Sequence, residues 1–216
     1  MKEDGVIGYG EVTLPPYLKE KPASVISLLH RIGALEIGSS AALLRVLEDE
    51  NLFGTDAQGC RAGLQTALSD LLARKVQIPV HQYVGIEQLK AGITLVTVGL
   101  SKLKELPGKL QELPQSGALK LKVGHEGSCD TMRIISELDE RPLFLDANQG
   151  LMTIEDALAL VEAAGDRLFA MEQPFPVNRS DLQRELVGRL NVCIYGDESI
   201  QDLIELEEAV GVFNGV

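Results

Sequence analysis

Four charged residues end successive apolar runs in the second half of the chain. They are separated by 24, 26 and 25 positions, and they are Lys122, Asp146, Glu172 and Asp197. A step of about 25 residues fits one strand, one helix and two turns, which is the repeat of a parallel α/β architecture. Each charge would then lie at the C-terminal end of its own strand.

The three carboxylates would point toward one spot, because neighbouring strands lie only about 4.8 Å apart. Uncompensated, they would repel one another and raise one another's pKa. A hard divalent cation removes this problem, and oxygen ligands suit magnesium, which keeps positions open for water or substrate. We therefore expect a magnesium site at Asp146, Glu172 and Asp197, with Lys120 and Lys122 facing a metal-bound substrate.

Other interpretations of the same residues remain open. The acids can be helix N-terminal charges at strand-helix turns, where the helix dipole favours them. Lys120 and Lys122 occupy alternate positions of one strand and so share a face, which could be an outward, solvated one. Two lysines on an inner face would be costly without partners.

Composition limits the kinds of protein this can be. With 216 residues, of which 45% are hydrophobic and 24% charged, the chain can bury a core. The net charge of −12 argues against nucleic acid or an anionic membrane as a partner. Three cysteines without metal-type spacing (Cys60, Cys129 and Cys193) favour reduced core thiols in the cytoplasm. The start of the chain has no apolar signal region, and no run of about 18 apolar residues occurs.

The chain changes character near residue 88. Before it, the sequence predicts a glycine-punctuated strand over 5–14 and helices over 23–32, 40–50 and 56–75. Small residues along the third helix suggest close packing against another element. After it, a buried strand over 93–100 opens a regular strand-helix alternation. This change divides the chain into residues 1–88 and 89–216.

Helix boundaries in the second region carry recognisable signals. Thr153, Ser180 and Ser199 each precede an acid or amide by three residues, as in a capping box or a close relative of one. The lysine-rich segment 102–111, broken by Pro107 and Gly108, reads as a solvated helix and loop. Residues 212–216 read as the start of another strand.

The strand-end motifs together resemble those of the enolase superfamily, in its muconate-lactonizing subgroup, and most of all the dipeptide epimerases of the Ala-Glu type. The motifs are Lys120-Leu-Lys122, Asp146-Ala-Asn148, Glu172-Gln-Pro174 and Asp197-Glu-Ser199. The segments 8–11, 15–18 and 67–71 also resemble the capping domain of dipeptide epimerases. The resemblance thus covers nearly the whole chain.

This resemblance implies an α/β fold of two domains. Residues 1–88 would form the N-terminal α+β capping domain, without its first strand. Residues 89–216 would form the first five to six strands of a (β/α)8 barrel of the TIM type, which takes about 250 residues when complete. We accordingly expect these residues to be the ordered part, or a fragment, of a longer protein.

The resemblance also implies roles for individual residues. Asp146, Glu172 and Asp197 would bind Mg²⁺, and Lys122 would be the base on one substrate face. Lys120 would neutralise the substrate carboxylate or tune Lys122, because two adjacent ammonium groups near a divalent cation lower each other's pKa. Asn148 and Glu198 would not bind the metal themselves but would hold its ligands in place. The family reaction removes the proton α to a carboxylate through a metal-stabilised enediolate.

The expected function is therefore magnesium-dependent epimerisation of a dipeptide such as Ala-Glu. The expected partner is a small-molecule carboxylate, and the chain could form a homo-oligomer. One alternative is another reaction of the subgroup, by a cycloisomerase or an o-succinylbenzoate synthase-like dehydratase. Another is a truncated, non-catalytic half-barrel, since the resemblance places a second catalytic lysine on a sixth strand that the 216 residues do not reach.

Overall fold

The computed structural model describes residues 1–15, 19–33, 39–53, 57–88, 92, 94–99 and 101–216. Two compact units make up the chain, and they are Met1–Ala91 and Gly92–Val216. This division falls close to residue 88, where the sequence pattern changes. The identification of the first unit as a capping domain stays a prediction. Residues 16–18, which belong to one of the motifs behind that prediction, lie outside the described residues.

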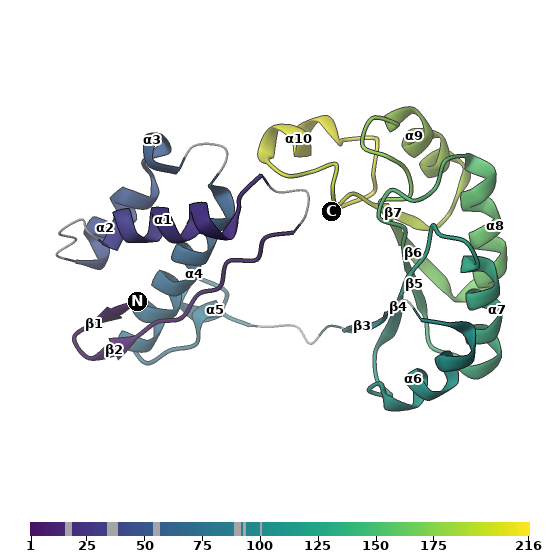
Figure 1. The fold of residues 1–216 in the computed structure, drawn as a ribbon, viewed down its shortest axis with the longest axis horizontal. Coiled ribbons are helices and arrows are strands. Elements are labelled where there is room, and N and C mark those ends of the chain that lie inside the picture. The colour runs from purple at the N-terminus through teal and green to yellow at the C-terminus, as the bar shows by residue number, and fades with distance from the viewer. Residues whose placement is uncertain (16–18, 34–38, 54–56, 89–91, 93, 100) are drawn as a thin grey trace. The chain divides into compact units, whose positions relative to one another are not determined.

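The described part of the first unit contains a short antiparallel hairpin and several helices (Figure 1). The elements are β1 (Lys2–Glu3), β2 (Val6–Ile7), α1 (Pro22–Gly33), α2 (Ser40–Leu47), α3 (Glu50–Phe53), α4 (Gln58–Lys75) and α5 (Val80–Tyr83). The helix predicted over 40–50 is present as α2, which ends at Leu47, and the short helix α3 follows after Asp49. The Asp49 side chain accepts a hydrogen bond from the Asn51 backbone N–H at 2.9 Å, as a residue at a helix start does.

The prediction of one strand over residues 5–14 is wrong. Asp4 and Gly5, at φ 50° and 80°, form the turn between β1 and β2, and β2 ends at Ile7. A positive φ is easily adopted by glycine and tolerated by aspartate. The glycine at position 5 therefore marks a hairpin turn.

Gly8 and Gly10 have another function, which is close packing against α4. A Cβ atom at Gly8 would lie 2.3 Å from the Ala67 carbonyl oxygen. One at Gly10 would lie 2.0 Å from the Gly63 carbonyl oxygen. Only backbone without a side chain fits at these distances. The expectation that the small residues of this helix pack closely against another element is confirmed.

The N-terminus of α4 is held by a side chain from far along the chain. Ala57, the residue that precedes the helix, makes no side-chain cap. Instead the carboxylate of Glu20, only 7% exposed, accepts hydrogen bonds from the N–H groups of Gly59 at 2.6 Å and Cys60 at 2.9 Å. A carboxylate at this position satisfies free N–H groups and complements the helix dipole.

The second unit is a parallel sheet with strands in sequence order, β3-β4-β5-β6-β7. Its strands are β3 (Leu95–Val98), β4 (Ala118–Lys122), β5 (Leu143–Asp146), β6 (Leu168–Glu172) and β7 (Cys193–Tyr195). Its helices are α6 (Leu106–Glu112), α7 (Ser128–Leu138), α8 (Ile154–Ala164), α9 (Ser180–Arg189) and α10 (Leu203–Glu208), with 3₁₀ turns at Leu103–Glu105 and Gly165–Arg167. Figure 1 shows α6 to α9 along one side of the sheet. This is the arrangement predicted for part of a (β/α) barrel.

The two faces of the sheet differ in chemistry. Leu121, Leu145 and Met171, each at most 1% exposed, belong to the apolar core that includes residues of the helices. The side chains that alternate with these residues along each strand point to the other face of the sheet. On that face Phe144 stacks on Tyr195, with ring centroids 6.1 Å apart. The alternation of strand side chains thus separates an apolar, helix-covered face from one that carries charges and aromatic rings.

One of the three predicted caps is present as expected. Thr153 caps α8, accepting from the Asp156 N–H at 3.2 Å, while the Asp156 carboxylate accepts from the Thr153 N–H at 3.0 Å. This reciprocal pair is a capping box. At the other end α8 stops at Gly165, whose φ is 61°.

The other two predicted caps are wrong. Ser180 is the first residue of α9, which follows Arg179 and has no side-chain cap. Helix α10 begins later than expected, and Asp202 caps it by accepting from two N–H groups at 2.9 and 2.8 Å. Ser199 does not cap a helix, because its hydroxyl accepts a hydrogen bond from Gln173 Nε2 at 2.7 Å. At Ser199, a hydrogen bond to a residue distant in the sequence replaces the predicted helix cap.

The segment 102–111 is helical and mostly exposed, in agreement with the prediction of a solvated helix and loop, although two of its leucines are buried. Helix α6 includes Pro107 and Gly108, because proline is tolerated in the first turn, where its missing N–H has no partner to lose. Leu106 and Leu110, 1% and 5% exposed, anchor the helix in the core. The two leucines are four positions apart, so they lie on the same face of the helix and both reach the core.

The last residues pair with β7, in agreement with the predicted start of a strand. Gly215 forms a parallel bridge with Tyr195, and its carbonyl accepts from the Gly196 N–H at 3.0 Å. Asn214 adds two bonds to Ile194, one through its N–H at 2.8 Å and one through its side-chain Oδ1 at 2.7 Å. These residues therefore extend the parallel pairing of the sheet beyond β7.

Two expectations from composition can be compared with the structure. The cysteines Cys60, Cys129 and Cys193 are free thiols, but only Cys60 is buried and Cys193 is exposed, so the prediction that they belong to the core is correct for Cys60 alone. In the described parts of the chain, no helix has both the length and the apolar composition needed to cross a bilayer.

The close approach at Gly10 predicts a specific loss of stability. Gly10→Ala forces a methyl group against the α4 backbone and should lower the free energy of unfolding by about 1–3 kcal/mol. The matched control is Gly33→Ala, where no described atom lies within 4 Å of the added Cβ. Urea unfolding followed by circular dichroism measures both. Equal midpoints for the two variants would contradict the packing role.

Candidate active site

The sheet register brings the predicted strand-end charges together. Lys122 pairs with Asp146 across β4 and β5, and Asp146 pairs with Glu172 across β5 and β6. Tyr195 pairs with Glu172 at the end of β7, and Asp197 follows two residues later. The predicted location of these groups at the C-terminal ends of the strands is confirmed.

Lys120 links two of the carboxylates. Its Nζ lies 2.9 Å from Asp146 Oδ2 and also bonds to Glu172 Oε2. The same ammonium lies 5.2 Å from the ring centroid of Phe144, within range of a cation–π contact. Its side chain is 21% exposed. The ammonium therefore serves as a shared cation between two acids on the face opposite the helices.

Lys122 connects the carboxylates to a polar chain. Its Nζ lies 2.6 Å from Asp146 Oδ2 and donates a further bond to Asn148 Oδ1. Asn148 in turn donates from Nδ2 to Glu198 Oε1 at 3.2 Å. Its backbone has a φ of 42° and donates an N–H to Asp146 Oδ1 at 3.2 Å. Asn148 thus connects Lys122 and Asp146 to Glu198 through hydrogen bonds, and the supporting roles of Asn148 and Glu198 stay a prediction.

The electrostatic environment differs among the three acids. Burial acts to raise the pKa of Asp146, but hydrogen bonds from Lys120 and Lys122 hold that pKa below its usual range. Burial raises the pKa of Glu172, and the charge of Asp146 adds to this rise while Lys120 opposes it. Burial, with the charges of Glu198 and Asp146, also raises the pKa of Asp197. The lysines therefore compensate only part of the negative charge.

The pKa of Lys120 moves opposite to the direction expected for a lysine beside another ammonium group. Burial acts to lower this pKa, but hydrogen bonds to Asp146 and Glu172 outweigh it, and the pKa is raised. The sequence-based expectation assumed a divalent cation at these carboxylates. With the carboxylates themselves as its partners, Lys120 is held in its charged form.

The three carboxylates are of the chemical type that binds magnesium, but they are not arranged around one point in this structure. Among the described residues, no three His, Cys, Asp or Glu side chains surround one point as metal ligands would. Asp146 and Glu172 already converge on one cation, the Lys120 ammonium. Asp197 is near enough for its charge to affect Glu172. All three offer carboxylate oxygens, the ligands that Mg²⁺ prefers. Magnesium binding by these residues stays a proposal.

Gln173 is a residue of this edge to which the sequence assigned no function. It follows Glu172 directly and is fully buried, at 0% exposure. Its side-chain Oε1 accepts from the backbone N–H groups of Asp197 and Ser199, each at 3.1 Å. The available signal was its place inside the Glu-Gln-Pro motif. Nothing in the local pattern indicates that its amide is buried against the next strand end.

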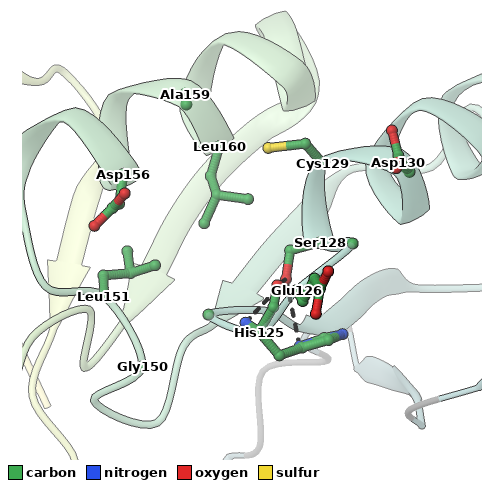
Figure 2. Close-up of a pocket in the computed structure, with 12 residues that line it drawn as sticks. His125, Glu126, Ser128, Cys129, Asp130, Gly150, Leu151, Asp156, Ala159 and Leu160 are labelled. Atoms are coloured by element: carbon green, nitrogen blue, oxygen red, sulfur yellow. Dashed lines mark hydrogen bonds between the residues drawn. The ribbon is translucent and has the colours of Figure 1, made fainter.

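A separate cavity of about 390 Å³ lies between the loop after β4 and helix α8 (Figure 2). Ser128 fixes this loop, since its hydroxyl accepts from the His125 N–H at 3.1 Å and donates to the His125 carbonyl at 2.6 Å. Glu126, Asp130 and Asp156 also line the cavity. None of the predicted catalytic or metal-binding residues does so, and the cavity is distinct from the site at the strand ends.

Tyr9 of the first unit lies at the surface of that unit. Tyr9 is 65% exposed, and the Arg74 guanidinium lies 5.5 Å from its ring centroid. Its backbone N–H donates to Asp70 Oδ2 at 2.9 Å. Tyr17 lies outside the described residues.

Comparison with known proteins identifies the class to which this sheet and its strand-end charges belong. Residues 109–211 match the family model of enolase C-terminal domain-like proteins. This match lies within the second unit, and the resemblance to the enolase superfamily inferred from the motifs is confirmed.

Several characterised relatives are similar over most of the chain. An L-Ala-D/L-Glu epimerase of Bacteroides thetaiotaomicron is 26% identical over 215 residues, which cover 99% of this chain and 56% of that protein. A hydrophobic dipeptide epimerase of Enterococcus faecalis is 29% identical over 218 residues, covering 94% and 60%. Muconate cycloisomerase 1 of Acinetobacter baylyi is 26% identical over 210 residues, covering 91% and 57%.

Solved structures share the fold. The dipeptide epimerase from Enterococcus faecalis V583 matches with a TM-score of 0.78 at 25% identity, over 98% of this chain and 64% of that one. A mandelate racemase/muconate lactonizing family protein from Azoarcus sp. EbN1 matches with a TM-score of 0.78 at 22% identity, over 98% and 60%. The chain thus spans between about half and two thirds of the length of its relatives, and its sheet corresponds to part of their barrel domain.

The shared ammonium of Lys120 predicts a cost for its removal. Lys120→Met leaves Asp146, 1% exposed, and Glu172 with less compensation. We expect a loss of about 1–3 kcal/mol in the free energy of unfolding, below the 3–5 kcal/mol typical of fully buried pairs because Lys120 keeps some solvent contact. Urea unfolding measures it. Lys104→Met, at an exposed site, should change stability by less than about 0.5 kcal/mol. A neutral effect at Lys120 would count against the shared-cation role.

Proposed function

We propose that this chain forms the base- and metal-bearing part of an enolase-superfamily isomerase, and that the enzyme is a magnesium-dependent dipeptide epimerase of the cytoplasm. One observation carries the proposal. Two lysines and two carboxylates meet at the C-terminal edge of a parallel sheet, the edge at which active sites of this architecture lie. The names of the dipeptide epimerases among the relatives support the choice of substrate class.

Lys122 is the residue proposed to take the α-proton. It is the more exposed of the two lysines, at 33% against 21% for Lys120. Its Nζ must first give up a proton to solvent and leave Asp146 Oδ2, because only the neutral amine has the lone pair that takes the proton of a substrate. The C–H bonding pair then remains on the substrate as the proton moves to Nζ. Epimerisation is completed when a second group returns a proton to the opposite face.

The carboxylates and Lys120 are proposed to bind and orient the carboxylate end of the substrate. A bound magnesium ion would supply Lewis-acid stabilisation of the negative charge that develops there. Asp146, Glu172 and Asp197 are its proposed ligands. Lys120 adds a second positive charge on the same face of the sheet, and the ring of Phe144 lies against it. The proton to be removed is too weakly acidic for a lysine without such stabilisation.

Solvent exchange at the α-carbon tests this proposal directly. Wild-type protein with Mg²⁺ in D₂O should replace the glutamyl α-hydrogen of Ala-Glu by deuterium, followed by proton NMR. Lys122→Ala should lower the exchange rate by about 10²–10⁴-fold, because it removes the general base. Lys104→Ala should exchange at the wild-type rate. Full exchange by Lys122→Ala would show that another group is the base.

A cycloisomerase is the second candidate, since muconate cycloisomerases are among the relatives. The same preparation can be offered cis,cis-muconate and its loss followed by ultraviolet absorbance. Turnover of muconate without exchange into dipeptides would replace the first proposal by the second. Metal binding without either reaction would support a non-catalytic half-barrel.

Metal binding can be tested apart from catalysis. Manganese is a suitable probe, because free Mn²⁺ is counted by electron paramagnetic resonance. Asp197→Asn should weaken Mn²⁺ binding by at least about tenfold, as loss of a ligand or its support does. Asp202→Asn is the matched control, because asparagine also caps a helix and the charge change is the same. Equal affinity in the two variants would exclude Asp197 as a ligand.

A further inference from the structure

Gln173 lies where three strand ends meet. Its backbone N–H donates to the Tyr195 carbonyl at 2.9 Å, and its own carbonyl accepts from the Gln149 N–H at 2.8 Å. The first bond joins it to the end of β7 and the second to the loop after β5. Its φ of 37° lies in the left-handed region, which non-glycine residues seldom adopt. The backbone is thus fixed at both sides immediately after Glu172.

The side-chain amide of Gln173 uses its full hydrogen-bonding capacity. Oε1 accepts from the N–H groups of Asp197 and Ser199 at 3.1 Å each. Nε2 donates to Ser199 Oγ at 2.7 Å and to the Phe175 carbonyl at 3.0 Å. An amide offers two acceptor sites and two donors, and all four are engaged. Three of the four bonds go to the segment 197–199.

This segment carries two groups of the proposed site. Asp197 is a proposed ligand, and Glu198 accepts from Asn148, which contacts Lys122. The bonds from Gln173 span both sides of Glu198, at its preceding and following residues. Because a residue held on both sides has little freedom in φ and ψ, the direction of the Asp197 and Glu198 side chains depends on the buried amide.

We propose that Gln173 is a positioning residue that sets the place of Asp197 and Glu198 at the sheet edge. The geometric part of this inference stands on the contacts of the segment 197–199 alone. Its consequence for metal binding rests on the proposed function. Gln173 touches neither the substrate nor the metal in this account, and acts only through the segment that it holds.

A neighbouring glutamine provides a matched control. Gln183 is 1% exposed, and its Nε2 donates to the same Phe175 carbonyl at 3.1 Å. Its Oε1 has no hydrogen-bond partner among the described residues, and no bond joins it to the segment 197–199. Gln183→Met and Gln173→Met therefore make the same chemical change in equally buried sites that share one acceptor. Only the second removes bonds to the segment.

Amide hydrogen exchange tests the geometric part without any metal. In Gln173→Met the amide protons of Asp197 and Ser199 should exchange at least about tenfold faster than in wild type, because each loses its acceptor. In Gln183→Met they should keep the wild-type rate. Unchanged rates in Gln173→Met, or equal acceleration in both variants, would overturn the inference.

Manganese affinity tests the consequence. Gln173→Met should weaken Mn²⁺ binding by about 10–100-fold, the usual effect of removing a group that supports a ligand. Gln183→Met should bind as wild type does. If wild type itself does not bind Mn²⁺, the proposed function fails while the exchange result still decides the positioning role. If wild type binds and Gln173→Met binds equally well, only the positioning role fails.

A second variant covers the case in which Gln173→Met does not fold. Gln173→Asn keeps a polar amide and suits a positive φ, but it is one methylene shorter and cannot reach both N–H groups. It should show the same acceleration of exchange at Asp197 and Ser199. Normal protection of these amides in Gln173→Asn would overturn the inference in the same way.

Discussion

The sheet edge depends above all on the burial of one carboxylate. Asp146 is 1% exposed, and a buried carboxylate without compensation costs several kcal/mol. The parallel register places Lys122 on one side of it and Glu172 on the other. Lys120, two residues earlier on the same face, reaches both acids. The positive charges are therefore required by the fold before any substrate is considered, and their identity as lysines also makes them candidates for proton transfer.

The sequence predicts the position of these groups because one physical repeat determines it. A strand, a helix and two turns take a nearly constant number of residues, so charges about 25 positions apart return to the same edge. Side-chain alternation then gives Lys120 and Lys122 one face. Both rules are geometric and do not depend on neighbours elsewhere in the fold. For this reason the sheet and its strand-end charges are predictable, while the roles of individual acids as ligands are not established by them.

Predictions fail where a residue has to choose between a local and a distant partner. Ser199 carries the pattern of a helix cap, yet its hydroxyl bonds to Gln173. Gly10 reads as part of a strand, but its position is set by the approach of α4. Leu106 and Leu110 belong to a segment that reads as solvated, and the core nevertheless buries both. In each case the deciding contact lies far along the sequence, so no local pattern reveals it.

The same distant contacts connect Lys122, the proposed base, to the rest of the edge. Lys122 contacts Asn148, Asn148 contacts Glu198, and the residues flanking Glu198 bond to Gln173. A substrate that draws Lys122 away from Asp146 must therefore also disturb a chain of bonds anchored by a buried amide. Because the Gln173 amide has no unused donor or acceptor, this series of hydrogen bonds resists displacement at its Gln173 end. In the proposed reaction the Lys122 side chain would therefore move, while the loop that carries Asp197 and Glu198 would stay in place.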